Sequence, residues 1–169
     1  KSLEKSIPLD VLAKKIDIPE KEISLLMAIK YDPLLDNDNT DQAVFSWVEI
    51  EHWADRIANE LKGTSVKSIS TVSRGGLIPA RLVADRRGIK QIFVDETEIQ
   101  GDIFIDDIYD TGKTYAKMKR KTKNKDIPFY FLLVRKGVEL PENCFASETT
   151  IDQSYVVFPW DKIEAKKLS

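Results

Sequence analysis

The spacing of hydrophobic and polar residues changes near residue 40 of the chain. Residues 7–30 place apolar side chains at helical spacing in two stretches with a polar break between them, and a polar, turn-rich segment follows. From Phe45 onward, helical patterns alternate with short runs of residues typical of strands. The pattern therefore predicts a helical extension over residues 1–40 and an α/β domain over residues 41–169.

The order of the predicted elements determines the fold expected of the α/β region. A helix is expected over residues 46–63, with Ser46 as its N-cap and Gly63 at its end. Further strands are expected at residues 66–72, 89–95, 102–106, 127–136 and 154–160, and further helices at residues 77–88 and 114–125. Strands that alternate with helices favour a mostly parallel, twisted sheet flanked by helices. Ligands bind beyond the carboxyl ends of the strands in such sheets.

Two of the predicted strands end in unusual loops, "SRGG" at Ser73 to Gly76 and "DDIYDTGKT" at Asp106 to Thr114. In the second loop, paired carboxylates follow the strand, and Thr-Gly-Lys-Thr then leads into a helix. The start of a helix offers unpaired N–H groups and a partial positive charge, which suit a phosphate. Adjacent carboxylates can accept hydrogen bonds from a ribose diol or bind Mg²⁺. The segment therefore suits a sugar phosphate.

Other interpretations of the second loop can be tested against its amino-acid sequence. A Walker A loop needs glycine five residues before its Gly-Lys-Thr, and that position is Asp107. An aspartyl-phosphate phosphatase would need a second aspartate at position 108, which is Ile108. A capped helix start with a solvated acidic loop stays open as a purely structural interpretation. On its own, "SRGG" favours a simple turn with an exposed arginine.

The two loops together carry a resemblance to a known family. "IFIDDIYDTGKT" resembles the phosphoribosyl pyrophosphate (PRPP) signature of type I phosphoribosyltransferases, and "STVSRGGLIPARLVA" resembles the pyrophosphate loop of the xanthine-guanine members. Further similarity extends from Ser46 to Asp161. The resemblance implies the type I phosphoribosyltransferase fold, here with a short hood and an N-terminal helical extension.

The resemblance also implies roles for individual residues. It assigns the 5′-phosphate of PRPP to Asp110, Thr111, Gly112, Lys113 and Thr114, ribose and Mg²⁺ to Asp106 and Asp107, and pyrophosphate to Ser73, Arg74, Gly75 and Gly76. A cis peptide is expected at Ser73–Arg74. The base would contact Lys136, the ring of Tyr155 and the backbone of Val156. Asp110 would serve as the general base, and Arg74 with Mg²⁺ would neutralise the departing pyrophosphate. Taken alone, Lys136 also suits a surface lysine and Tyr155 a core aromatic.

The activity that the resemblance implies is a PRPP-dependent, Mg²⁺-dependent pentosyltransferase of purine salvage. It would convert a 6-oxopurine (guanine, xanthine or hypoxanthine) to its nucleoside monophosphate and release pyrophosphate. The connection Asp95–Gly101 departs from the family, because its seven residues are too few for a long lid. A PRPP-binding regulator without turnover and a transferase for another nitrogenous acceptor therefore stay open.

The extension over residues 1–40 is expected to pack over the active site or a dimer interface. Its pattern also resembles a helix-turn-helix, but Asp17 occupies the usual glycine position and the second helix carries little positive charge. A packed helical hairpin is therefore favoured.

The composition narrows the classes of partner. A formal net charge of −2 lacks the excess of positive charge that nucleic-acid or membrane-surface binding uses. No apolar run approaches the roughly 20 residues of a membrane span. Cys144 is the single cysteine, which fits a reducing compartment, so a cytoplasmic protein is expected. The resemblance adds an expectation of a homodimer or homotetramer.

Overall fold

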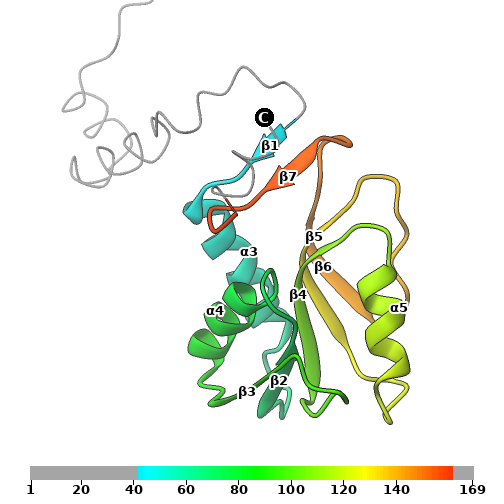
Figure 1. Ribbon diagram of the computed structural model, residues 1–169. Helices are drawn as coiled ribbons and strands as arrows, with labels where there is room; N and C mark the ends of the chain where they lie inside the picture. Colours follow the sequence, from blue (N-terminus) through cyan, green and yellow to red (C-terminus); the bar gives the residue numbers. More distant parts are fainter. Residues whose placement is uncertain (1–41, 162–169) are drawn as a thin grey trace, which may run out of the picture. The chain divides into compact units, whose positions relative to one another are not determined.

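The computed structural model of the protein describes residues 42–161 (Figure 1). The predicted extension over residues 1–40, its boundary with the next domain, and residues 162–169 lie outside the described residues. Two compact units are present: Trp47–Tyr155, and a smaller unit whose described residues are 42–46 and 156–161. Each unit is described by itself. Within the described residues, no helix has the length and apolar character needed to cross a bilayer.

A five-stranded parallel sheet forms the centre of the larger unit. Its strands are β2 (Ser68–Thr71), β3 (Gln91–Val94), β4 (Ile103–Tyr109), β5 (Phe129–Val134) and β6 (Cys144–Thr149), in the order β3-β2-β4-β5-β6. Each neighbouring pair is parallel. The predicted parallel sheet is therefore confirmed, and β6 is an addition that the sequence pattern does not predict.

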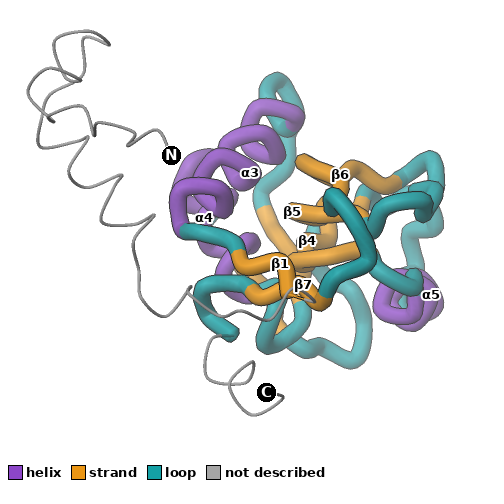
Figure 2. The backbone as a smooth tube through the Cα atoms, turned by 90° about the horizontal axis from the view of Figure 1, so that it is seen from above, coloured by secondary structure: helices purple, strands orange, loops and turns teal. Residues whose placement is uncertain are grey.

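Helices cover both faces of the sheet. Helices α3 (Trp47–Glu60) and α4 (Leu77–Arg87) lie on one face, and α5 (Lys113–Arg120) lies on the other (Figures 1 and 2). Helix α5 ends at Arg120 and not at the predicted residue 125. The Thr122 hydroxyl accepts the Asn124 N–H and donates to the Asn124 carbonyl, at 3.1 and 3.0 Å. Such local hydrogen bonds offer the backbone an alternative to the helix.

Aromatic packing on the α5 face holds β4 and β5 in place. A buried cluster consists of Phe104, Met118, Ile127, Phe129 and Phe131. The rings of Phe104 and Phe129 lie 5.1 Å apart, and Tyr115 from α5 packs on Phe129 at 4.8 Å. Each fully buried phenylalanine contributes about 1.5–3 kcal/mol by removal of apolar surface from water. This core fixes the strand that carries the acidic residues.

Strand β4 is longer than its sequence pattern predicts. The predicted strand ends at residue 106, whereas β4 continues to Tyr109 because its ladder with β5 continues. Asp106 lies opposite Phe131, and Ile108 lies opposite Leu133. The acidic pair therefore lies within the strand and not in the loop after it, which corrects the sequence-based prediction.

A separate two-stranded sheet pairs β1 (Gln42–Val44) with β7 (Tyr155–Val157). Except for Tyr155, the first residue of β7, these residues belong to the smaller unit. The Phe45 N–H donates to the Val157 carbonyl at 3.1 Å, and the rings of Phe158 and Trp160 stack at 4.7 Å. The strand predicted at residues 154–160 is therefore shorter than predicted. It pairs with β1 and does not extend the five-stranded sheet, which corrects the expected series.

Candidate functional site

The two unusual loops meet at the carboxyl end of the sheet. Gly75 lies so close to Asp107 that an added Cβ would overlap the carboxylate. A Cβ on Gly76 would overlap the Thr71 hydroxyl and lie 3.0 Å from Oδ1 of Asp106. Only glycine fits such close approaches without a local shift. The structure thus brings the "SRGG" loop after β2 into contact with the acidic pair on β4.

The "SRGG" loop has the backbone that the sequence predicts. The Ser73–Arg74 peptide is cis, which confirms the expectation. The side chains of both residues are exposed, and the loop leads directly into α4, whose N-cap is Gly76. The loop therefore places two glycines and the start of α4 beside the two carboxylates, and it also carries the exposed Arg74. A helix start and a nearby arginine suit an anion.

The acidic pair combines a buried and a partly exposed carboxylate. Asp106 is only 5% exposed, and its Oδ1 accepts the N–H of Asp107 at 3.0 Å. Burial, and secondly the charge of Asp107, raise the pKa of Asp106 well above its usual range. Asp107 accepts the Ile108 N–H at 2.7 Å. A bound cation or hydrogen-bond donor would remove part of the cost of this buried charge.

The donor set fits Mg²⁺ if other molecules complete its coordination. Among residues 42–161, no group of three or more His, Cys, Asp or Glu side chains could hold a metal ion. Mg²⁺ commonly binds through one or two carboxylates and takes its remaining ligands from water and substrate phosphates. Asp106 and Asp107 would therefore hold the ion only together with such a substrate.

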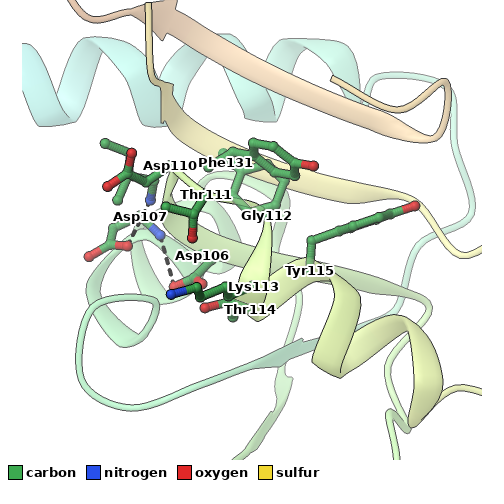
Figure 3. A pocket seen from close by; sticks show the side chains of 11 residues that line it. Asp106, Asp107, Asp110, Thr111, Gly112, Lys113, Thr114, Tyr115 and Phe131 are labelled. Carbon is green, nitrogen blue, oxygen red and sulfur yellow. Dashed lines mark hydrogen bonds between the residues drawn. The ribbon is translucent and has the colours of Figure 1, made fainter. Parts of the chain in front are cut away.

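A pocket of ≈ 160 Å³ lies beside the acidic pair (Figure 3). Its lining is Asp106–Tyr115 together with Phe131. Gly112 has a φ of 71°, and a Cβ there would lie 2.7 Å from the Tyr109 hydroxyl. Helix α5 begins at Lys113, directly after this glycine, and the side chains of Thr111, Lys113 and Thr114 are exposed. The pocket therefore offers a helix N-terminus, two hydroxyls and an ammonium group to a phosphate.

Asp110 makes a two-point ion pair with Arg135, a residue that the sequence reasoning missed. Nε of Arg135 donates to Oδ1 of Asp110 at 3.1 Å, and a terminal nitrogen donates to Oδ2 at 3.4 Å. Arg135 is 8% exposed and also donates to the Ser154 carbonyl at 2.7 Å. Its position directly after the wholly buried strand β5 could have identified it in the sequence. A charged side chain next to such a strand tends to be buried, and a buried charge needs a partner of opposite charge.

The three residues predicted to contact the base do not line the pocket beside the acidic pair. Lys136 is exposed; its N–H donates to Oγ1 of Thr150 at 3.0 Å, and its carbonyl accepts from Gln153 at 2.8 Å. Tyr155 is 50% exposed, so it is no core aromatic. Val156 is buried and belongs to the smaller unit. The base-binding roles of these three residues stay predictions.

The short connection between β3 and β4 is fastened to the far end of α5. The Ile99 N–H donates to the Lys121 carbonyl, and Nζ of Lys121 donates to the Glu96 carbonyl, both at 3.2 Å. Glu98 forms an ion pair with Lys123 at 2.9 Å. The connection that is too short for a long lid is thus held at the carboxyl end of the helix whose amino end lines the pocket.

Comparisons with known proteins test the family resemblance. No protein-family model matches the sequence. Xanthine-guanine phosphoribosyltransferase from Idiomarina loihiensis is 28% identical over 140 residues, which cover 69% of this chain and 84% of that protein. The resemblance to type I phosphoribosyltransferases is thereby supported in sequence as well as in motifs.

Solved structures agree in fold. A purine phosphoribosyltransferase from Pyrococcus horikoshii superposes with a TM-score of 0.58 at 23% identity, over 72% of this chain and 94% of that chain. The Helicobacter pylori xanthine-guanine-hypoxanthine enzyme gives 0.58 at 13% identity, over 75% and 97%. A Neisseria gonorrhoeae protein with bound ppGpp gives 0.53 at 16% identity, over 78% and 97%. The chain has the fold of these proteins, and the predicted fold class is confirmed.

Proposed function

We propose that this protein, which has the fold of the type I phosphoribosyltransferases, transfers the 5-phosphoribosyl group from PRPP to a purine base. The observation that carries the proposal is the contact of Gly75 and Gly76 with Asp107 and Asp106. That contact brings the "SRGG" loop and the start of α4 next to a pair of hard oxygen donors. The start of α5 lines the pocket beside the same carboxylates. PRPP carries a phosphate on C5 and a pyrophosphate on C1 of a ribose whose two other hydroxyls form a diol. Its binding therefore needs two anion sites and a group that accepts hydrogen bonds from the diol.

Each part of the site would bind one part of PRPP. The loop at residues 110–114 would hold the 5′-phosphate, the acidic pair the ribose hydroxyls, and Arg74 the pyrophosphate. Mg²⁺ bound at the acidic pair would supply positive charge for the departing pyrophosphate. Transfer breaks the bond from ribose C1 to pyrophosphate oxygen and forms the bond from C1 to a purine nitrogen. The proton of that nitrogen would pass to the Asp110 carboxylate.

Arg135 would act as a positioning residue in this reaction. Its two hydrogen bonds fix both oxygens of Asp110, and its third, to Ser154, fixes the guanidinium itself. A carboxylate held in one orientation is a more effective proton acceptor than one that must first be ordered. The proposal retains Lys136 as the donor to the purine C6 oxygen, because ammonium donates and cannot accept from an amino group.

The wider assignment follows the same proposal. The products would be pyrophosphate and a nucleoside monophosphate, as in salvage of free bases such as guanine, xanthine or hypoxanthine. Mg²⁺ dependence, a homodimer or homotetramer, and a cytoplasmic location belong to the proposal too. The named relatives act on purines, and those names support the base class without deciding the preferred base.

A second candidate is a PRPP-binding regulator without turnover. The observation that favours it is the short connection at Asp95–Asp102, which is held on α5 and supplies no lid over the pocket. A transferase for another nitrogenous acceptor is the third candidate, for the same reason.

One assay separates the three candidates. Purified protein with PRPP and Mg²⁺ is given guanine, xanthine, hypoxanthine, adenine and orotate, and pyrophosphate release is measured with and without EDTA. We expect release with at least one 6-oxopurine and none in EDTA. Release with orotate alone would favour another acceptor. PRPP binding without release from any base would overturn the transferase and favour the regulator.

A further inference from the structure

Asp95 links the end of β3 to the loop that would bind pyrophosphate. It is the first residue after β3, and its N–H donates to the Thr71 carbonyl at 3.1 Å. Its carboxylate Oδ1 accepts the N–H of Ser73 at 2.9 Å. Ser73 is the first residue of the "SRGG" loop and lies two positions after the end of β2. One side chain therefore joins two neighbouring strand ends at the edge of the site.

The charge state of Asp95 suits this contact. The hydroxyl of Ser73 and then its N–H lower the pKa of Asp95, with smaller contributions from Lys117 and Lys121 on the α5 side. The side chain is therefore a carboxylate at neutral pH. Since pyrophosphate is also an anion, Asp95 is unsuited to touch it, and any influence on pyrophosphate must pass through Ser73.

The backbone at Asp95 restricts which residues can occupy the position. Its φ is 55°, in the left-handed region that aspartate, asparagine and glycine adopt most readily. Glycine would supply this conformation without an acceptor. Asparagine would supply both the conformation and an acceptor oxygen, without the charge. The position thus offers variants that separate backbone shape, hydrogen bonding and charge.

The segment that follows Asp95 is itself anchored. Nζ of Lys121 donates to the Glu96 carbonyl, and the Ile99 N–H donates to the Lys121 carbonyl. Asp95 therefore projects from a segment held by α5, the helix whose start forms the phosphate pocket. Because this backbone segment is anchored, the single side chain of Asp95 can orient the loop that it contacts.

We propose that Asp95 is a positioning residue for the pyrophosphate half of the site, holding Ser73 so that the "SRGG" loop is ordered before pyrophosphate arrives. The inference rests on the proposed function. It predicts a selective defect: without the Asp95 acceptor, the loop must be ordered by the ligand, and pyrophosphate binds more weakly while the 5′-phosphate pocket is unaffected.

Two variants at Asp95 and one control test the proposal. We expect Asp95→Gly to weaken binding of Mg²⁺-pyrophosphate by about tenfold, the loss typical of one hydrogen bond to a charged acceptor. Its affinity for ribose 5-phosphate, which lacks pyrophosphate, should stay within about twofold of wild type, since the residues around that ligand are unchanged. Asp95→Asn should restore pyrophosphate affinity to within about threefold of wild type, because its oxygen still accepts from Ser73.

The control is Asp102→Asn, since Asp102 also accepts backbone N–H groups, at the opposite end of β2. It should leave affinity for both ligands unchanged. Calorimetric titration gives the affinities, and thermal unfolding shows that each variant folds. In turnover assays the Asp95→Gly defect should appear in the KM for PRPP more than in kcat.

Several results would overturn the role of Asp95. These are wild-type pyrophosphate affinity in Asp95→Gly, an equal loss for ribose 5-phosphate, or an asparagine variant as impaired as the glycine variant. The role and the proposed function fail separately. Pyrophosphate binding without release from any base counts against turnover only, and equal affinities of wild type and Asp95→Gly count against Asp95 only.

Discussion

The two ends of strand β4 carry aspartates in opposite situations. At the amino end, Oδ2 of Asp102 accepts the N–H groups of Lys67 and Ser68 at 2.9 and 3.0 Å, and the Ser68 hydroxyl at 2.9 Å. The Lys67 N–H is the main cause that lowers the pKa of Asp102. At the carboxyl end, Asp106 is buried beside Asp107, and its pKa is raised. The carboxylate next to the start of the strand thus has a lowered pKa, and the one near its end has a raised pKa.

The contrast distinguishes an acid that stabilises the fold from one that costs stability. Hydrogen bonds from neighbouring backbone groups offset the desolvation of Asp102, whereas Asp106 has a like charge next to it and one N–H donor. Unfavourable local arrangements of this kind cluster at functional sites, where a ligand completes them. The difference therefore supports the proposal that substrate binds at the carboxyl end of the sheet.

The largest expected effect concerns Asp110. Asp110→Ala should lower kcat by about 10²- to 10⁴-fold, the usual contribution of a general base, while PRPP affinity stays within about threefold. Pyrophosphate release and calorimetric PRPP binding measure the two quantities. The matched variant at the other end, Asp102→Ala, should keep kcat and lose thermal stability. A fully active Asp110→Ala would remove Asp110 from the reaction.

Glycines at the two ends provide the next test. A Cβ on Gly76 would lie 2.9 Å from the Ile105 carbonyl oxygen, and one on Gly101 would lie 2.6 Å from the Ile69 carbonyl carbon. Substitution by alanine at either position should cost about 1–3 kcal/mol of unfolding free energy by overpacking. The Gly76 variant alone should also raise the KM for PRPP. Equal effects on KM would contradict the assignment of function to one end. Urea denaturation and PRPP titration provide the measurements.

Arg135 and Lys136 are adjacent, and the proposal gives them different kinetic signatures. Arg135→Lys removes the two-point contact with Asp110 and should lower kcat by about tenfold, with the KM for the base unchanged. Lys136→Ala should raise the KM for the base by about tenfold, with kcat nearly unchanged. Steady-state assays with guanine distinguish the two. If Lys136→Ala leaves both kinetic constants unchanged and Arg135→Lys raises the KM for the base, base recognition would be assigned to Arg135 and not to Lys136.

The smallest expected effects are the stabilities of the two carboxylate ends. Asp102→Asn should cost about 1 kcal/mol at pH 7, because a partly solvated carboxylate loses charge-assisted hydrogen bonds. Asp106→Asn should stabilise the ligand-free protein by about 1 kcal/mol, since it removes a buried charge beside Asp107. Chemical denaturation of both variants without Mg²⁺ measures this difference in sign. If both substitutions stabilise the protein, or if neither does, the claim that Asp102 stabilises the fold while Asp106 destabilises it would be wrong.

The pH dependence of the Asp102 contribution follows from the direction of its shift. The folded-state pKa of Asp102 is lowered, so its stabilisation is fully present above its unfolded pKa, about 3.9. It is lost as the pH falls through the lower folded-state value. The stability difference between wild type and Asp102→Asn should therefore disappear in acid and persist at pH 7.

Local patterns in the sequence predict most of the larger unit. The cis peptide at Ser73–Arg74 was expected from the family resemblance. The alternation of strands and helices predicts the parallel sheet, and the Thr-Gly-Lys-Thr motif predicts the glycine-led start of α5. These features depend on neighbouring residues, so a single sequence contains enough information. The sequence places both loops at the carboxyl ends of strands, but the contacts of Gly75 and Gly76 with the acidic pair are visible only in three dimensions.

Features that depend on distant partners were missed. The pairing of β7 with β1 and the addition of β6 depend on long-range partners that periodicity does not identify. Arg135 was overlooked because its partner, Asp110, lies 25 positions earlier in the chain. Asp95 was read as part of a short connection, and its carboxylate contact with Ser73 is visible only in three dimensions.

The hydrogen bonds that hold the Asp95–Asp102 connection on α5 have a consequence for the hydrolysis of PRPP by water. Its ties to Lys121 and Lys123 lie beyond the end of α5, and eight helical residues separate that end from the phosphate pocket by about 12 Å. Within residues 42–161, this connection therefore does not cover a positively charged sugar centre near Asp110 against bulk water. We therefore expect slow hydrolysis of PRPP to ribose 5-phosphate whenever the base is scarce. The ratio of nucleotide to ribose 5-phosphate would measure how well the protein protects that centre.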